Sequence, residues 1–558
     1  MEFRKLAAGV LDSVAVERVI NRQGDCLEGL GMFGFWRRVP EFWQNFIVGL
    51  LIIGGLLSLT GSRHVKGWED WAVDLMISLN SRLERVTGQH QGRDDLQFSF
   101  LEMDEGTYRQ WKEPFHIPRD KLLKLIKFAS TGKAAVIIVD VNLSKEGIDP
   151  AADEELRNFL LNYSPGAPPL VLMRATRKQR LDPDENLETF RQTYLGDAER
   201  SNIHFAQPLF DRDPDKVIRN WIFLKQGCYK DKGAVLPSVQ LLVYALLKDR
   251  LEGDKKNLLD LDASLRANRP LSCKRNNKVG GVRRPVIIGK TVFKQQRLGE
   301  RLIYTMPWEG SGYPESPDLM ATPANFITEG TKNSPPSTDY SLVRDRITLI
   351  GASYGASNDL HLTPLDRMPG GLIILNAVKS LSLFEQISPP PLYIRLAFLL
   401  TFITLMSYVF ATFGTIVKLI IVTSLVFIFF VPISFWFFKY GVWFDFGILL
   451  LGIKLQHSAS EFFEVRELKR LRAKMQEIEL GHAGRGDSPK GSVPDTGDIL
   501  DPDETEVRVR LRRNLDGSYR VKAAPAGGAG TEFNIGSDGL TKNADGYVLD
   551  LKALDQSD

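Results

Sequence analysis

Two stretches of apolar residues constrain this 558-residue chain more than any other feature. Phe46–Leu59 carries no charge, and with its flanks the apolar segment 42–61 is long enough to cross roughly 30 Å of hydrocarbon. The second stretch divides at short polar connections into three segments, 393–413, 416–438 and 441–462. The sequence therefore predicts four transmembrane helices, although 43% apolar residues is an ordinary average for a soluble protein.

The flanks of these segments indicate how the chain is oriented. The stretch of about forty residues before the first segment is too long for the basic start of a signal peptide, and no small-residue cleavage pattern follows. We therefore expect an uncleaved anchor. Basic residues precede the first segment and follow the last, namely Arg37, Arg38, Arg466, Lys469, Arg470 and Arg472. Both termini are then predicted to be cytoplasmic, which places residues 62–392 outside.

Charge and cysteine content exclude several classes of protein. Lys and Arg number 71 against 68 Asp and Glu, so a net charge of +3 gives no electrostatic case for nucleic-acid binding. The three cysteines, Cys26, Cys228 and Cys273, are too scattered for a metal site, and no metal or cofactor is expected. Cys228 and Cys273 are able to pair in an external domain, but two unpaired cysteines fit the sequence at least as well.

Residues 62–392 alternate runs typical of buried strands with helical periods. The predicted strands are Leu96–Met103, Ala134–Val141, Pro169–Met173, Arg284–Ile288 and Arg346–Gly351. The predicted helices are Arg119–Ser130, Asp153–Tyr163, Pro237–Leu251 and Leu372–Phe384. Continuous apolar strands that alternate with helices indicate an α/β extracytoplasmic domain with a mainly parallel sheet.

Polar side chains after the predicted strands are the candidates for a binding site. Ligands bind outside the carboxyl ends of parallel strands, so we expect Asp104, Asp140 and the loop after Gly351 to share one crevice. The candidate ligand-binding residues are Asp104, Tyr108, Trp111, Arg119, Asp140, Ser353, Asp359 and His361. Helix capping and turn formation explain the three aspartates equally well, and the neighbouring polar residues better.

Two motifs within this domain carry a resemblance to a known family. The first is FLEMDEGTYRQW, residues 100–111, and the second is ITLIGASYGASNDLHLTPLDRMPGGLIILNA, residues 347–377. They resemble the CHASE2 family of bacterial extracytoplasmic sensor domains, whose pattern also includes a strand that ends in aspartate, here Asp140. The second motif matches at Gly351, Ala352, Ser353, Asp359, Thr363, Pro364, Pro369, Gly370 and Asn376. The resemblance covers about residues 45–455.

The resemblance implies a bacterial inner-membrane protein that senses an envelope signal and relays it through its transmembrane helices. Members of the family commonly continue into a kinase or a cyclase, but residues 456–558 contain no Gly-rich phosphate loop and no kinase motif. We therefore expect no catalysis by this chain, an unidentified extracytoplasmic ligand or envelope protein, and a separate cytoplasmic signalling partner. A membrane scaffold without a small-molecule ligand is the alternative.

One motif favours a hydrolase. Gly351-Ala-Ser353-Tyr-Gly355 matches the G-x-S-x-G nucleophile elbow and follows a predicted strand. The residues after it show no helical period, and Asp359 and His361 are closer in sequence than the acid and base of a hydrolase usually are. Hydrolysis is therefore the disfavoured interpretation.

The terminal segments are predicted to be cytoplasmic. Within segment 1–41, Phe3–Val19 has amphipathic spacing typical of a helix at the inner membrane surface. Segment 463–480 is a charged helix with two heptads, which leaves a homodimeric stalk open. Segment 481–558 begins as a flexible linker and then alternates as strands do. The expected hairpins are Glu506–Arg513 with Ser518–Lys522, and a weaker one within Thr531–Leu551.

Overall fold

The computed structural model divides into two compact units. The α/β unit contains Gly67–Pro391 and Phe429–Gly447, and the other unit contains most of the apolar helices. The described residues are 40–58, 63–87, 96–178, 188–191, 202–230, 232–270, 284–295, 298–308, 318–330, 335–413, 415–447, 449–460, 507–513, 519–525 and 531–535.

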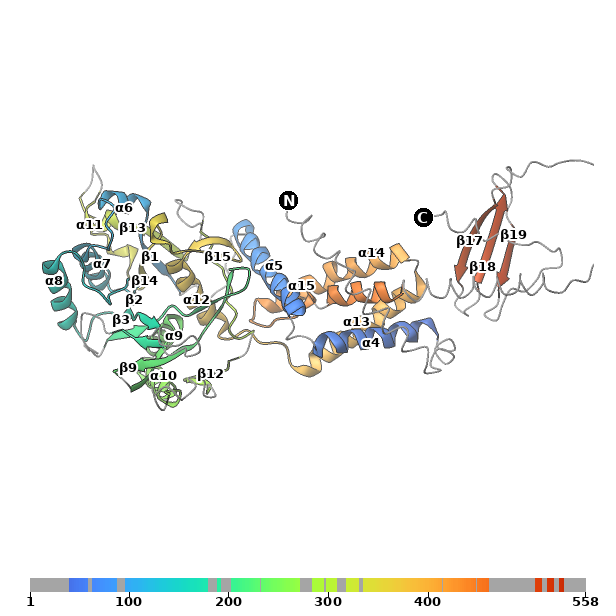
Figure 1. Cartoon of the computed structure of the whole chain (residues 1–558), viewed down its shortest axis with the longest axis horizontal. Coiled ribbons are helices and arrows are strands. Elements are labelled where there is room, and N and C mark those ends of the chain that lie inside the picture. Colours follow the sequence, from blue (N-terminus) through green and yellow to red (C-terminus); the bar gives the residue numbers. More distant parts are fainter. Residues whose placement is uncertain are drawn as a thin grey trace, which may run out of the picture. The chain divides into compact units, whose positions relative to one another are not determined.

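A six-stranded sheet forms the centre of the α/β unit (Figure 1). Its order is β13-β1-β14-β2-β3-β6, and every pairing is parallel, which confirms the predicted mainly parallel sheet. The strands are β1 (Phe98–Met103), β2 (Val136–Val139), β3 (Leu170–Met173), β6 (Ile203–Ala206), β13 (Leu319–Pro323) and β14 (Ile347–Ala352). Strand β14 comes last in the chain but lies between β1 and β2, so it brings the late motif beside the early one.

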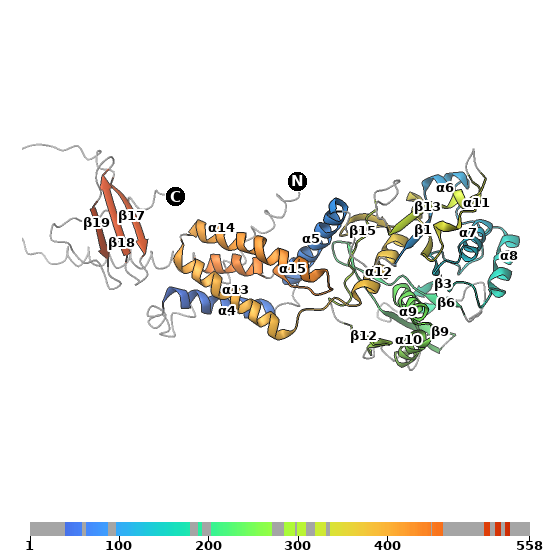
Figure 2. The same cartoon turned by 180° about the vertical axis from the view of Figure 1, so that it is seen from behind.

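Helices cover both faces of this sheet (Figures 1 and 2). One face carries α7 (Arg119–Thr131), α8 (Pro150–Leu161) and α11 (Ala324–Thr328). The other carries α9 (Val239–Glu252) and α12 (Gly370–Phe384). Four of these helices agree closely with the predicted ones, since their apolar side chains recur with helical spacing.

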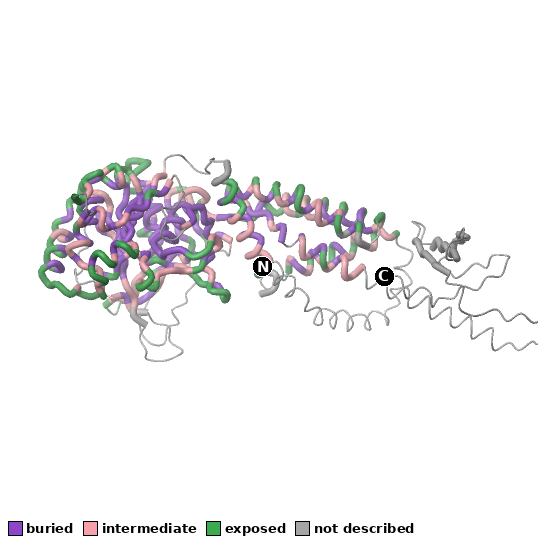
Figure 3. Tube along the Cα trace, turned by 90° about the horizontal axis from the view of Figure 1, so that it is seen from above, coloured by how far each residue is buried: buried purple, intermediate pink, exposed green. Residues whose placement is uncertain are grey.

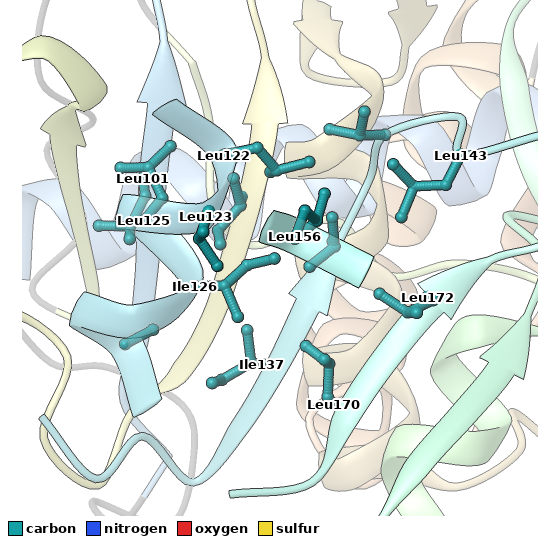
Figure 4. Close-up of a cluster of buried hydrophobic side chains, with 14 of the residues drawn as sticks. Leu101, Leu122, Leu123, Leu125, Ile126, Ile137, Leu143, Leu156, Leu170 and Leu172 are labelled. Carbon is teal, nitrogen blue, oxygen red and sulfur yellow. The ribbon is translucent and has the colours of Figure 1, made fainter. Parts of the chain in front are cut away.

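The core under α7 and α8 is built from leucine and isoleucine (Figure 4). Leu122 and Ile126 of α7 are fully buried, as are Leu101 of β1 and Leu172 of β3. Buried residues gather in the interior of the α/β unit (Figure 3). Each such side chain contributes about 1.5–3 kcal/mol to stability, so this core holds the strand ends in fixed positions.

One predicted strand takes another role. Arg284–Ile288 was expected to join the parallel sheet, but β11 (Val286–Ile288) pairs antiparallel with β12 (Thr291–Phe293). Gly289, at φ 58°, begins the two-residue turn between them. A glycine with positive φ favours a tight hairpin, so the chain reverses instead of crossing to the sheet.

Smaller elements surround the central sheet. They include α5 (Arg63–Thr87), α6 (Glu105–Gln110), α10 (Lys256–Ala267), η1 (Tyr340–Leu342) and η2 (Gly355–Ser357). A second sheet has the order β10-β9-β5-β4, with strands Lys232–Pro237, Leu224–Tyr229, Glu188–Phe190 and Thr176–Lys178. Two hairpins, β7–β8 (Phe210–Arg212, Ile218–Trp221) and β15–β16 (Leu360–Thr363, Asp366–Pro369), are joined by a parallel bridge between Val217 and Leu362.

Three helices among the described residues are long and apolar enough to cross a membrane. They are α4 (Glu41–Ser58), α13 (Leu392–Thr412) and the stretch Ile420–Phe438. This stretch comprises the end of α14 (Thr415–Leu425), a π-helical turn (Val426–Phe430) and α15 (Val431–Phe438). Pro432 explains the π turn, because proline donates no hydrogen bond and its ring displaces the preceding carbonyls.

The fourth predicted segment, 441–462, is helical later than expected. Residues 446–447 and 449–460 are helical, whereas 441–445 are not. Asp445 accepts a hydrogen bond from the Gly447 N–H at 3.0 Å, as an N-cap residue does. Further along this helix, the Gln456 amide donates to the Asn45 carbonyl of α4 at 3.0 Å.

A three-stranded antiparallel sheet forms in the tail from β17 (Val507–Arg513), β18 (Tyr519–Pro525) and β19 (Thr531–Ile535). The first predicted hairpin is therefore confirmed. Strand β19 pairs with β18, and the rest of the weaker hairpin predicted within Thr531–Leu551 lies outside the described residues. The predicted helices at Phe3–Val19 and 463–480 lie outside the described residues.

Candidate functional site

Glu102, Gly351 and Asp140 lie side by side at the carboxyl edge of the central sheet. Glu102 of β1 is in register with Gly351 of β14, and the Asp140 N–H donates to the Ile350 carbonyl at 2.9 Å. A Cβ on Gly351 would lie 3.6 Å from the Cβ of Asp140. A side chain at Gly351 would clash with Leu349 at 2.9 Å, so a glycine is needed where β14 passes between the strands that carry the two acidic residues.

Asp359 approaches the same edge from the loop after β14. Asn358 before it has a left-handed backbone, with φ 54°, which turns the chain back toward the sheet. The Asp359 carbonyl accepts a hydrogen bond from the Gly370 N–H at 2.8 Å. A Cβ on Gly370 would lie only 2.5 Å from the Asp359 carboxylate, so this carboxylate packs directly against the first residue of α12.

His361 links Asp359 to β7. Its Nε2 lies 3.1 Å from Oδ1 of Asp359, and its Nδ1 lies 2.8 Å from Nη2 of Arg212. Because a guanidinium only donates hydrogen bonds, Nδ1 is the acceptor and Nε2 carries the proton. His361 therefore donates to Asp359 as a neutral imidazole.

Burial and neighbouring charge perturb two of these carboxyl groups. Burial raises the pKa of Glu102, and the charge of Asp104 adds to this, while hydrogen bonds from Ser353 and Trp308 oppose it. Burial and then the charge of Asp359 raise the pKa of Asp140 from 3.8 to about 7. No hydrogen bond to the Asp140 carboxylate comes from the described residues. Perturbed carboxyl groups that share one edge are typical of a functional site.

We expect Asp140 to make the α/β unit less stable as the pH rises. Its pKa is higher in the folded chain than in the unfolded one, so its stabilising contribution is complete below about pH 4 and is lost as the pH rises through about 7. The shift corresponds to at most about 4 kcal/mol. The measurement is thermal unfolding of the full-length chain in detergent between pH 5 and 8.5. The wild type should lose stability as the pH rises, and Asp140→Asn should lose less, by at most about 4 kcal/mol.

The exposed cap residue Asp149 provides the control for this measurement. Its side chain accepts a hydrogen bond from Ala151 N–H at 3.0 Å, and Asp149→Asn should keep the pH dependence of the wild type. An Asp140→Asn profile parallel to that of the wild type would contradict the assignment.

Asp104 and Tyr108 lie beside this edge but serve local structure. Asp104 is the N-cap of α6, since its Oδ1 accepts a hydrogen bond from Thr107 N–H at 2.7 Å. The ring of Tyr108 stacks on that of Tyr354, with centroids 4.1 Å apart. The contact that Asp104 makes is therefore that of a helix cap. A role in ligand binding stays a prediction for Asp104 and for Tyr108.

The structure does not bring Trp111 and Arg119 to the carboxylates. Trp111 is 8% exposed and belongs to the core under α7. Arg119 contacts Asp153, with Nε 3.4 Å from Oδ1, and donates to the Lys145 carbonyl at 3.1 Å. Ser353 is buried, and its hydroxyl lies beside Glu102.

Sequence reasoning missed a cluster of ion pairs that holds α5. Arg301 reaches Asp70 at 2.5 Å and Asp74 at 2.6 Å, while Arg219 reaches Asp74 at 2.9 Å. Arg219 also binds Asp213 and Asp215. We call these six residues, Asp70, Asp74, Asp213, Asp215, Arg219 and Arg301, the α5 clasp. The spacing of Asp70 and Asp74 by four residues was the available signal, but nothing local identifies their arginine partners.

No group of three or more His, Cys, Asp or Glu side chains that could hold a metal ion occurs within the described part of the chain. Cys228 of β9 takes part in a disulfide bond. The other two cysteines, Cys26 and Cys273, lie outside the described residues.

The chain combines helices that are long and apolar enough to cross a membrane with an α/β unit that carries a polar cluster at the carboxyl edge of a parallel sheet. The family model of the CHASE2 domain matches residues 47–414, which is most of the chain. The chain therefore belongs to the CHASE2 family, a family of sensory domains found in membrane proteins. No curated protein and no solved structure matches it.

Proposed function

We propose that this chain is a four-span inner-membrane sensor that detects an envelope signal and relays it to a separate cytoplasmic partner. The observation that carries the proposal is the way α5 is held by ion pairs within the α/β unit, close in sequence to an apolar helix. The α5 clasp binds α5 to the α/β unit, and only four residues separate α5 from the apolar helix α4. A change of pose in the α/β unit therefore has a direct covalent route to α4.

The polar contacts of the last helix support a fourth span. Gln456 bonds Asn45 of α4, and Lys418 of α14 donates to Ser460 at 2.9 Å. Polar side chains that bond across apolar helices are typical of packed transmembrane bundles. An even number of spans keeps both termini on the cytoplasmic side, as the basic flanks require.

The disulfide bond of Cys228 supports placement of the α/β unit outside the cytoplasm, because disulfides persist in oxidising compartments. Cys273 is the partner we favour. Cys228 pairs across the second sheet with Gly233, and the Pro270 carbonyl packs against the Cα of Gly233. Three residues of chain then suffice to bring Cys273 to Cys228.

The topology can be tested with thiol labelling in intact cells. Because Cys228 is buried, the reagent is applied in cells and the labelling is completed after the protein is unfolded. We expect Cys228 to resist a maleimide reagent until a reductant is added, and Cys273→Ser to make it reactive without the reductant. A reporter inserted at Asp254, in the exposed turn after α9, should be active only outside the cytoplasm. A reporter active in the cytosol, with Cys228 reactive before reduction, would overturn the proposal.

The contacts of His361 favour a sensor over a hydrolase. Both of its ring nitrogens are engaged, one by Asp359 and one by Arg212, whereas Ser353 lies beside Glu102. A nucleophilic serine needs a base that accepts its proton. A 3₁₀ turn at Gly355–Ser357, which starts on the last residue of the elbow, stands where the motif requires a helix.

A scaffold function remains the second candidate because two apolar side chains are exposed on loops at the same sheet edge. Phe115, between α6 and α7, is 88% exposed, and Ile148, between β2 and α8, is 74% exposed. Exposed apolar side chains of this size are typical contacts for a protein partner. If the chain is a scaffold, Phe115→Ser with Ile148→Ser should release a stoichiometric envelope protein without lowering the thermal stability. If it is a sensor, the double variant should keep its signal response.

A further inference from the structure

We propose that the carboxylate pair of Asp140 and Asp359 makes the α/β unit respond to external acidity, and that the response reaches α5 through the β15–β16 hairpin and β8. This inference rests on the proposed sensor function and names its signal as the proton. The residues concerned lie far apart in the sequence but are connected in the fold through the β15–β16 hairpin and β8.

The pair is asymmetric in its contacts. Asp359 accepts the N–H bond of neutral His361, whereas the Asp140 carboxylate accepts no hydrogen bond from any described residue. An ionised carboxylate is the better acceptor for His361, so a proton shared by the pair resides on Asp140. Gly351 and Gly371 face the same Leu349 side chain, so Asp140, beside Gly351, and Asp359, against Gly370, lie near each other. Loss of the proton leaves two negative charges at this edge of the sheet, and these repel each other.

The elements around Asp140 contribute few charged groups. Strand β1 contributes Glu102, and β14 contributes the uncharged Gly351. Beyond Asp359 itself, β15 contributes His361, and β7 contributes Arg212 through His361. Helix α12 begins with Gly370 and Gly371 after the N-cap Pro369, and none of the three carries an ionisable side chain. Burial and Asp359 raise the pKa of Asp140 to about 7, which lies within the range of acidity that an envelope protein meets.

The packing around Asp359 determines the direction in which it moves when the two ionised carboxylates repel each other. The carboxylate already touches the first residue of α12, where even a methyl group at Gly370 would lie 2.5 Å away. Helix α12 is itself fixed, because Asn376 binds the backbone of Thr305 and Met306 at 2.9 Å. Asp359 therefore has no room toward α12. It moves together with β15, which begins at the next residue.

Strand β15 passes the displacement to β8 and so to the α5 clasp. Leu362 of β15 is bridged to Val217, which immediately precedes β8. Two residues after Val217, the Arg219 Nε donates to the Asp74 carboxylate of α5 at 2.9 Å. The Leu302 N–H donates to the Arg219 carbonyl at 2.8 Å, which ties Arg301 to the same strand. Both arginines that hold α5 are thus connected to the hairpin that carries His361.

Hydrogen–deuterium exchange of the full-length chain in lipid nanodiscs tests this path. Exchange would be measured at about pH 5.5 and about pH 8 and corrected for the intrinsic chemical rate. In the wild type, we expect peptides from β15–β16 and from α5 to exchange about tenfold faster at the higher pH. Asp140→Asn keeps the size of the side chain without its charge, and it should show the slow exchange of low pH at both values.

Two further variants separate the steps. Asp74→Ala removes the acceptor that both arginines bind on α5, and it should leave the pH response of β15–β16 in place while that of α5 becomes weaker. Asp149→Asn, on an exposed cap, should behave as the wild type does. An α5 that is indifferent to pH in the wild type, or an Asp140→Asn chain that responds as the wild type does, overturns the inference.

The outcome is distinguishable from failure of the proposed function. A reporter at Asp254 that is active in the cytosol rejects an extracytoplasmic sensor altogether. If that reporter is active outside while α5 is indifferent to pH, the sensor stands and the proton is not its signal.

Discussion

Replacing Arg301 by alanine should lower the free energy of unfolding of the α/β unit by about 3–5 kcal/mol. Arg301 is 4% exposed and bonds two carboxylates of α5, Asp70 and Asp74. Removal of the guanidinium leaves two partly buried negative charges with one cation fewer, and this costs more than the ion pair itself contributes. Chemical denaturation of the full-length chain in detergent, followed by tryptophan fluorescence, would measure the change.

The ion pair of Arg109 and Glu105 provides a matched control. These side chains are 70% and 49% exposed, so Arg109→Ala should change stability by less than about 0.5 kcal/mol. Equal effects of Arg301→Ala and Arg109→Ala would show that the α5 clasp is no more than a set of surface pairs. The double variant Arg301→Ala with Asp70→Asn should recover part of the loss, because it removes one of the stranded charges.

The second large effect is expected at Asn376. Its Oδ1 accepts hydrogen bonds from the N–H groups of Thr305 and Met306, both at 2.9 Å. Its Nδ2 donates to the Met306 carbonyl at 2.9 Å and to the Leu372 carbonyl at 3.0 Å. Asn376 is fully buried, so Asn376→Ala would leave backbone groups without partners and should destabilise the chain by about 3–5 kcal/mol. The same denaturation experiment measures it.

Asn162 is a suitable comparison because it also bonds the backbone through its amide. Its Nδ2 donates to the Asn158 carbonyl at 2.9 Å, but the residue is exposed and water can replace the bond. We expect Asn162→Ala to cost about 1 kcal/mol or less. If Asn376→Asp were as stable as the wild type, the Nδ2 bonds would not contribute as described.

The candidate site was predicted in part because strand ends can be recognised locally. Asp140 follows a run of apolar residues, and Asp359 lies in the loop after another. The sequence could not show that the Asp104 carboxylate would accept a hydrogen bond from the Thr107 N–H, because a helix cap and a ligand-binding aspartate occupy the same position after a strand. Trp111 belongs to the core for a similar reason, because burial depends on which helix packs over it.

Glu102 lies in the first family motif, residues 100–111, but the sequence did not predict that it belongs to the candidate site. It lies on a strand face where burial usually excludes a carboxylate, and only the contacts with Ser353 and Trp308 explain its position. Arg212 is harder still to predict. It lies 149 residues from His361 in the sequence and reaches it through a hairpin of its own.

Local sequence determined which segments are apolar helices, which runs form strands and helices of the α/β unit, and which family the chain belongs to, because hydrophobic period and motif are properties of neighbouring residues. Tertiary structure decided that β14 enters between β1 and β2, that the charge of Asp359 acts on Asp140, and that two arginines hold α5. These are contacts between residues far apart in the chain. Their partners are selected by the packing of the whole core and by the order of strands, and no local pattern records either one.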